Sequence, residues 1–227
     1  MRILIFGGLN AVGASITNYF LQEGVETKVV KTTPFNEAEE EQELFFGRNE
    51  LYRAIDSRSE LEDEDGESID TVCFAGHLEK QKKEELFKDF ETVLKGCRKV
   101  ETVILLSQDF VGERGDNERA DVSEEDYFQD IERRFSDQFE SREKAEKCRL
   151  FILRLPKGLL SNKPFKEKKE IKKMAKAVFE LAGCPHQNGV HAFRFVSNKN
   201  FGSMESGEGT PFRVEESHPL TSEDAEK

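Results

Sequence analysis

The N-terminal stretch MRILIFGGLNAVGASITNYFLQEGVETKVV, Met1–Val30, decides the fold because it contains one complete unit of strand, glycine turn, helix and strand. Ile3–Phe6 is a continuous apolar run, which is typical of a strand buried on both faces. Gly7 and Gly8 follow it directly, and Val25–Val30 returns to an extended pattern. The stretch therefore predicts the first two neighbouring strands of a parallel sheet.

The helix between these strands is predicted from the spacing of its apolar residues. Val12, Ile16 and Phe20 recur every four residues on one face, Gly13 lies in the first turn, and Gly24 ends the pattern. Glycines in such a turn let the backbone approach a phosphate closely. The free amides at the helix N-terminus then point at the anion, with the helix dipole behind them. The turn is thus a candidate nucleotide site.

Length and charge limit the classes of protein that the chain can represent. With 227 residues it is large enough for one sizeable core, so we expect a domain over residues 1–200 and an acidic, flexible tail over 201–227. The formal net charge is −12, and 35% of the residues are charged. Nucleic acid is a poor partner for such a chain, because neutralising phosphates requires a basic surface.

Cysteines and hydropathy exclude further classes of site. Cys73, Cys97, Cys148 and Cys184 lie far apart without a C-x-x-C pair or a histidine at ligand spacing, so we expect no metal site and no disulfide framework. No apolar segment reaches the length of a membrane helix, and the first residues lack the layout of a signal peptide. We expect a cytoplasmic protein.

The glycine spacing of the turn resembles that of a known family. Gly7, Asn10 and Gly13 form G-x-x-N-x-x-G, which is similar to the G-x-x-G-x-x-G turn of short-chain dehydrogenases/reductases with Asn10 in the central glycine place. Asparagine is the other residue that best tolerates a left-handed backbone, so we expect the turn to persist. The resemblance implies that Gly7, Asn10, Ala11, Val12 and Gly13 contact the cofactor.

Three later positions match cofactor contacts of that family. Lys31 follows the second strand, where a cation suits the extra phosphate of NADP, so we expect a slight preference for NADP over NAD. Asp56 follows the third predicted strand and matches the residue that accepts from the adenine amino group, although a helix N-cap is an equally good interpretation. Ala75 and Gly76 follow the next strand and resemble the small pair beside the cofactor ribose.

The catalytic part of the resemblance is incomplete. LLSQDFVGE resembles the S-S-x-x-V-Y-G signature of the extended members, including nucleotide-sugar epimerases and dehydratases, and puts Ser107 at the end of a strand in the catalytic place. The family's redox step also uses a tyrosine and a lysine four residues later. Tyr127 is the only tyrosine in the region, and Ile131 stands in the lysine place.

The position of LRLPKGLL supports this alignment, because it is similar to the family's L-R-P-x-x-V-Y-G segment and places Arg154 at the usual distance. A second alignment would put Gln138 and Arg142 in the pair. Neither leaves an intact tyrosine–lysine pair. Tyr127 or Phe128 also begins an apolar stripe at helical spacing, so core packing is the favoured interpretation of Tyr127.

The rest of the chain alternates between strand and helix patterns. The acidic run from Asn36 predicts an exposed helix or loop, and the lysines of 163–173 predict a solvated face, with an acidic ligand as the sharper alternative. Helices are also predicted over Glu79–Gly96 and from Ile171 to Ala182. Further strands are predicted over Leu51–Ile55, Ile69–Ala75, Thr102–Leu106 and Gly189–Ser197.

Together these patterns predict an α/β fold, a Rossmann-like, right-handed, doubly wound parallel sheet with a reduced C-terminal lobe. The resemblance implies an NAD(P)-binding protein that acts as an oxidoreductase or isomerase on an alcohol or carbonyl substrate, such as a nucleotide sugar. It also implies a homodimer built through two helices. The alternative is a non-catalytic nucleotide-binding or scaffold protein that has lost the tyrosine–lysine pair.

Overall fold

The computed structural model describes residues 1–31, 36–55, 68–76, 83–97, 99–109, 122–141, 148–156, 168–185, 188–197 and 212–217. The strands are β1 (Arg2–Phe6), β2 (Glu26–Val30), β3 (Tyr52–Ile55), β4 (Thr71–Phe74), β5 (Thr102–Asp109), β6 (Arg149–Pro156), β7 (Gly189–Ser197) and β8 (Phe212–Ser217). The helices are α1 (Ala11–Gln22), α2 (Glu37–Phe46), α4 (Lys83–Gly96), α5 (Val122–Glu140) and α7 (Lys168–Ala182).

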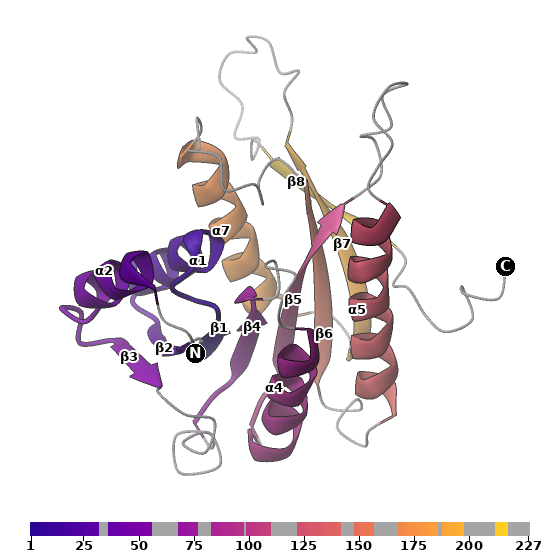
Figure 1. The fold of residues 1–227 in the computed structure, drawn as a ribbon, viewed down its shortest axis with the longest axis horizontal. Coiled ribbons are helices and arrows are strands. Elements are labelled where there is room, and N and C mark those ends of the chain that lie inside the picture. Colours follow the sequence, from indigo (N-terminus) through magenta and orange to yellow (C-terminus); the bar gives the residue numbers. More distant parts are fainter. Residues whose placement is uncertain are drawn as a thin grey trace, which may run out of the picture.

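One sheet carries all of these strands, in the order β3-β2-β1-β4-β5-β6-β7-β8 (Figure 1). The first seven are parallel to their neighbours, and β8 is antiparallel to β7. At the centre, Ile5 of β1 pairs with Val29 of β2 and with Cys73 of β4. The prediction of a Rossmann-like doubly wound α/β fold is confirmed.

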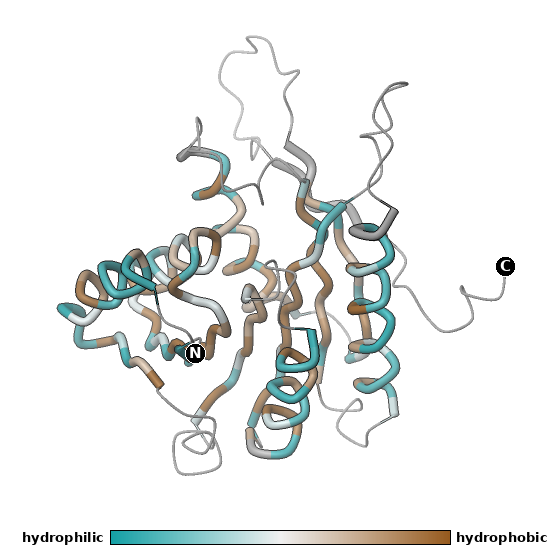
Figure 2. The backbone as a smooth tube through the Cα atoms, viewed as in Figure 1, coloured by the Kyte–Doolittle hydropathy of each residue, from teal (hydrophilic) through white to brown (hydrophobic). Residues whose placement is uncertain are grey.

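Helices cover both faces of the sheet. The core on one face joins α1, α2 and α7 to the sheet, through buried residues such as Ile16, Phe46 and Val178. The core on the other face joins α4 and α5 to it, with Phe90 and Phe135 stacked at a centroid separation of 4.1 Å. Hydrophobic residues accordingly run along the central strands, whereas each helix alternates between hydrophobic and hydrophilic residues (Figure 2).

The connection through α7 departs from the prediction that every crossover has the same hand. The β1–α1–β2 unit steps toward β3 across the sheet, whereas β6–α7–β7 steps the opposite way on the same face. Its hand is therefore opposite to that of β1–α1–β2. Packing explains the position of α7, because the ring of Phe179 contacts those of Tyr19 and Phe20 on α1, at centroid separations of 5.7 and 5.2 Å. Sequence periodicity cannot reveal which face such a helix covers.

Local backbone and side-chain contacts explain where α2 begins and where α1 ends. Asn36 caps α2 with a reciprocal capping box, in which its side chain accepts from the Glu39 amide and the Glu39 carboxylate accepts from the Asn36 amide. The acidic run is therefore a helix. Gly24, with a φ of 75°, lies just beyond α1 and turns the chain into β2.

Strand β8 lies within residues 201–227, for which the sequence predicts a flexible tail and no strand. It pairs with β7 from Ala192↔Ser217 to Ser197↔Phe212. Among the described residues, no helix is long and apolar enough to cross a bilayer. No group of three metal-binding side chains occurs in those same ranges. None of the four cysteines, all of which lie among the described residues, forms a disulfide bond, and Cys73, Cys97 and Cys148 are buried.

Candidate nucleotide site at the glycine turn

The turn between β1 and α1 is closely packed against its own backbone. Gly7 has a φ of 74°, which a residue with a side chain rarely adopts. A Cβ atom on Gly13 would lie 2.0 Å from the Gly7 carbonyl oxygen, and one on Gly7 would lie 2.3 Å from Cα of Gly76. Both glycines are therefore required by the packing of strand, turn and helix, whether or not a ligand is bound.

Asn10 serves the turn differently from the prediction. Its φ of −70° and ψ of 169° are extended, so the left-handed residue of the turn is Gly7 and the predicted reason for an asparagine is wrong. Asn10 is instead the N-cap of α1: its Oδ1 accepts from the Gly13 amide at 2.7 Å. Its Nδ2 donates to the Ala75 carbonyl at 3.2 Å, which ties the turn to the end of β4.

The first turn of α1 can still hold an anion. The Gly13 amide is taken by Asn10, and the Ala14 amide donates to the Asn10 carbonyl at 2.7 Å. The amides of Ala11 and Val12 are the first-turn donors without an intrahelical acceptor. No acidic residue lies in this turn, so nothing there offsets the positive end of the helix dipole. These two amides are the donors of the turn that an anion could contact.

Lys31 follows β2, as predicted, but its side chain has a protein partner. Its Nζ lies 2.7 Å from Oε1 of Glu43 on α2, and both side chains are about three-quarters buried. A phosphate placed beside Lys31 would have to share the ammonium group with this carboxylate. The Lys31 amide donates to the carbonyl of Ile55 at the end of β3, and Asp56, the next residue, lies outside the described residues.

Ala75 and Gly76 lie against the glycine turn. Ala75 is fully buried, and its amide donates to the Phe6 carbonyl at 2.9 Å. A Cβ on Gly76 would approach Cα of Gly7 to 3.3 Å. The structure therefore brings together five of the predicted cofactor residues, namely Gly7, Asn10, Gly13, Ala75 and Gly76.

Ser107 lies inside a strand, not at its end. The prediction ended the strand at Leu106 with Ser107 following, but β5 continues to Asp109 because β6 pairs with it as far as Asp109↔Pro156. Ser107 is fully buried, and among the described residues its Oγ has no hydrogen-bond partner. The hydroxyl is available to a ligand only if one reaches the sheet beneath α5.

The environment of Tyr127 differs from that of a catalytic tyrosine beside a lysine. Its ring lies against the ring of Phe128, and the Nζ of Lys83 on α4 is 5.6 Å from the ring centroid. Burial raises the pKa of Tyr127 above its ordinary value of 10. Ile131, one turn later, is fully buried in the core. The predicted apolar stripe of this helix is confirmed, with Phe128, Ile131, Phe135 and Phe139 all buried.

For the alternative alignment of the pair, the structure describes only one of the two residues. Gln138 lies on α5, and its buried Oε1 has no hydrogen-bond partner among the described residues. Arg142, the cation of that alignment, lies outside the described residues.

Sequence reasoning missed a buried set of charges near Ser107. Arg154 of β6, the register partner of Ser107, forms a forked ion pair with Glu132 of α5, at 2.7 and 3.1 Å, and the Glu132 side chain is 3% exposed. Asp109 of β5 lies 2.6 Å from Nε of Arg194 on β7. The available signal was two polar residues two apart near the end of β5, which period-2 geometry puts on one face, and an arginine near the end of each of the next two strands.

Comparisons with known proteins agree with this architecture. No protein-family model matches the chain, and no curated protein does. Among solved structures, UDP-glucose 4-epimerase from Bifidobacterium longum, in complex with NAD+ and UDP, has a TM-score of 0.59 at 15% identity. This likeness covers 86% of this chain and 77% of the epimerase. A carbonyl reductase from Pseudomonas aeruginosa has a TM-score of 0.58 at 16% identity, covering 85% of this chain and 95% of that one.

Yeast methylglyoxal/isovaleraldehyde reductase, complexed with NADPH, has a TM-score of 0.52 at 14% identity. The likeness covers 69% of this chain but only 58% of the yeast reductase. At such identities these structures show a shared fold. They show that the chain resembles NAD(P)-dependent reductases and epimerases in structure.

Proposed function

We propose that this protein binds an adenine dinucleotide at the glycine turn, with the pyrophosphate on the amides of Ala11 and Val12. The observation that carries the proposal is the first turn of α1, which presents two donors without an intrahelical acceptor and no acidic side chain. The fold supports it, because ligands of doubly wound sheets bind at the carboxyl ends of the strands, where this turn lies.

Lys31 is the candidate for contact with the adenosine half. A cation at the end of β2 suits the extra phosphate of NADP, which is the basis for a slight preference for that cofactor. The ion pair with Glu43 reduces this preference, because the carboxylate competes with the phosphate for one ammonium group. We therefore propose NADP(H) as the tighter ligand by a small margin, with NAD(H) also bound.

We further propose that the bound dinucleotide serves a non-catalytic role, as in a scaffold or regulatory protein. A nicotinamide cofactor supplies or accepts a hydride, and the protein must then exchange a proton with the substrate oxygen. Tyr127 is poorly suited to that exchange, because burial raises its pKa and the helix offers the apolar Ile131 one turn later.

The second candidate function is an oxidoreductase or epimerase that acts on an alcohol or carbonyl substrate, such as a nucleotide sugar. The buried, unpartnered Oγ of Ser107 favours it, since a hydroxyl at this place can hydrogen-bond a reacting oxygen. Ser107 and Tyr127 would then be the groups that contact the substrate.

Calorimetric titration with NADH and NADPH tests the first proposal, using two matched variants of α1. Ala11→Asp puts a carboxylate beside the proposed phosphate contact, at an exposed position where an acidic residue also favours the helix. It should weaken binding at least about tenfold without lowering the melting temperature. Ser15→Asp adds the same charge one turn later and should change affinity less than about threefold.

Two outcomes decide between the candidates. No binding of either nucleotide to the wild type would remove both functions. Binding without hydride exchange on alcohol, carbonyl or nucleotide-sugar substrates supports the non-catalytic role. Hydride exchange that is lost in the Tyr127→Phe variant supports the oxidoreductase or epimerase function.

A further inference from the structure

The exposed apolar residues of the described chain are concentrated in one place. The large hydrophobic side chains that remain exposed there are Met1, Leu44, Phe45 and Leu51, and three of the four lie within eight residues. Leu44 is 73% and Phe45 61% exposed, whereas the neighbouring Phe46 is 3% exposed and packs into the core. Phe46 alone attaches the end of α2 to the core, so packing within the fold does not explain the apolar side chains of Leu44 and Phe45. Clustered exposed apolar side chains of this kind mark interaction surfaces.

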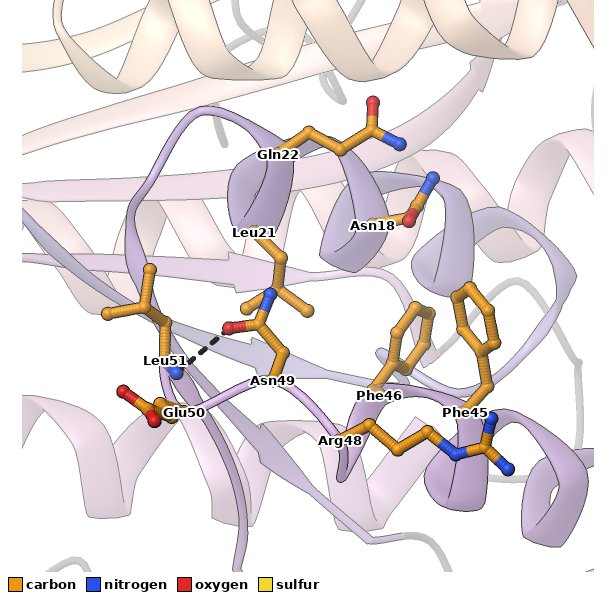
Figure 3. A pocket seen from close by; sticks show the side chains of 9 residues that line it. All are labelled: Asn18, Leu21, Gln22, Phe45, Phe46, Arg48, Asn49, Glu50 and Leu51. Atoms are coloured by element: carbon orange, nitrogen blue, oxygen red, sulfur yellow. Dashed lines mark hydrogen bonds between the residues drawn. The ribbon is translucent and has the colours of Figure 1, made fainter.

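A groove lies beside these side chains, between α1 and α2. One hollow of about 610 Å³ lies between the end of α1 and the turn after α2, and Figure 3 shows Phe45 and Phe46 side by side on its wall, with Leu21 and Leu51. A second hollow of about 410 Å³ continues along α1 to Ala11. The two share Asn18, Phe45 and Phe46, so they form one groove, which we call the α1–α2 groove.

The groove has the length of a short helix. It follows α1 over Ala11–Gln22, a helix of 12 residues and therefore about 18 Å long. This corresponds to about three turns of a partner helix laid along it. Apolar side chains at helical spacing are the usual anchors in such a groove. The amide side chains of Asn18, Gln22 and Asn49 line the rest of the larger hollow and provide polar contacts (Figure 3).

The helix that forms one wall of the groove is acidic. The groove lining itself carries one cation, Arg48, and one carboxylate, Glu50, but α2, which forms one wall, also exposes Glu37, Glu40 and Glu41 and has no basic residue. An occupant must therefore combine apolar anchors with positive charge. A second copy of this chain fits poorly, because an isologous contact through this surface would oppose the same glutamates on both copies.

We propose that the α1–α2 groove binds a basic amphipathic helix of a partner protein. Its apolar face is seated on Phe45, Phe46 and Leu51, and its lysine or arginine side chains lie against the glutamates of α2. Phe45, Phe46 and Leu51 line the larger hollow, which lies toward the end of α1 opposite to the amides of Ala11 and Val12, so the proposal does not depend on nucleotide binding.

A fluorescent model peptide tests the proposal with the full-length protein. The probe is an amphipathic helix of about four turns made of leucine and lysine, and binding is followed by fluorescence anisotropy. The wild type should bind it, and Phe45→Ser should bind at least about tenfold more weakly, because an apolar anchor is lost. Phe45 is exposed, so this variant should keep the wild-type melting temperature.

Two charge-reversal variants distinguish peptide binding at the groove from attraction to the overall negative charge of the protein. Glu41→Lys, on α2, should weaken binding about threefold or more, whereas Glu85→Lys should change it less than about twofold. Glu85 is also exposed but lies on α4, on the opposite face of the sheet. Both variants change the net charge equally, so only position distinguishes them.

The proposal is wrong if Phe45→Ser binds as the wild type does, or if the two charge reversals weaken binding equally. Sedimentation equilibrium tests the alternative occupant, a second copy of this chain. If the wild type forms dimers that Phe45→Ser converts to monomers, the groove holds a second copy and not a basic helix.

Discussion

Replacing Asn10 by glycine should strengthen dinucleotide binding while weakening the fold. The Asn10 side chain makes two hydrogen bonds, from the Gly13 amide at 2.7 Å and to the Ala75 carbonyl at 3.2 Å. Asn10→Gly removes both and leaves the Gly13 amide as a third donor at the N-terminus of α1. The variant also completes the G-x-x-G-x-x-G spacing that the turn resembles.

The magnitudes follow from these two bonds. Glycine is itself a tolerated N-cap, so the lost cap costs only a few tenths of a kcal/mol, and the lost bond to Ala75 costs about 1 kcal/mol. The free energy of unfolding should fall by about 1 to 1.5 kcal/mol, equivalent to a melting temperature about 2 to 6 °C lower. A new hydrogen bond from Gly13 to a phosphate contributes about 1.5 to 3 kcal/mol, so affinity should rise at least about tenfold.

Calorimetric titration with NADH and NADPH measures the affinity, and thermal unfolding without ligand measures the stability. Asn10→Asp is the control: it keeps the acceptor that caps α1 but adds a negative charge, so it should bind more weakly than the wild type. The reasoning is refuted if Asn10→Gly binds no more tightly than the wild type at temperatures where both are folded. Tighter binding by Asn10→Asp would equally contradict it.

Three further predictions concern the described core. Glu132→Ala leaves the Arg154 guanidinium without its buried partner and should lower the free energy of unfolding by about 3 to 5 kcal/mol in urea titrations; a loss below about 1 kcal/mol would show that the pair is solvated. Because burial raises the pKa of Tyr127, the folded state keeps this proton longer than the unfolded state, so its contribution to stability is constant below pH 10 and lost above it. Tyr127→Phe should flatten that alkaline decline, measured by urea unfolding at several pH values, and an unchanged slope would contradict the assignment. Burial raises the pKa of the Cys73 thiol to about 12, so Cys184, which is partly exposed, should react first with Ellman's reagent and Cys73 only on unfolding; rapid reaction of Cys73 in the native protein would disprove its burial.

Much of the fold could be predicted from local patterns. Most of the described strands and helices of the first two hundred residues have a counterpart in the apolar spacing of the sequence, because a buried strand or an amphipathic helix imposes its period on the chain. The exceptions are β6, which was not predicted as a strand, and α2, whose acidic run was predicted as a helix or a loop. The strand Gly189–Ser197 agrees with its predicted bounds. The boundary at Ser107 was wrong because the neighbouring β6 extends the pairing of β5 to Asp109.

The candidate site was less predictable than the fold. The sequence located the glycine turn but gave the wrong reason for Asn10, since the side chain is explained by a contact with Ala75, 65 residues away. The sequence also did not predict that Lys31 pairs with a glutamate of the next helix, or that Glu132 pairs with Arg154. Each of these contacts joins two different elements, so no pattern within one element predicts it.

By itself, then, the sequence determined which segments form strands and helices and that they alternate into a parallel, doubly wound sheet. The reason is that hydrophobic period, glycine turns and caps act within a few residues. The tertiary structure alone decided the face on which α7 lies, the length of β5 and the contact of Asn10 with Ala75. These depend on which surfaces meet across the sheet, and that is set only when the whole chain packs together.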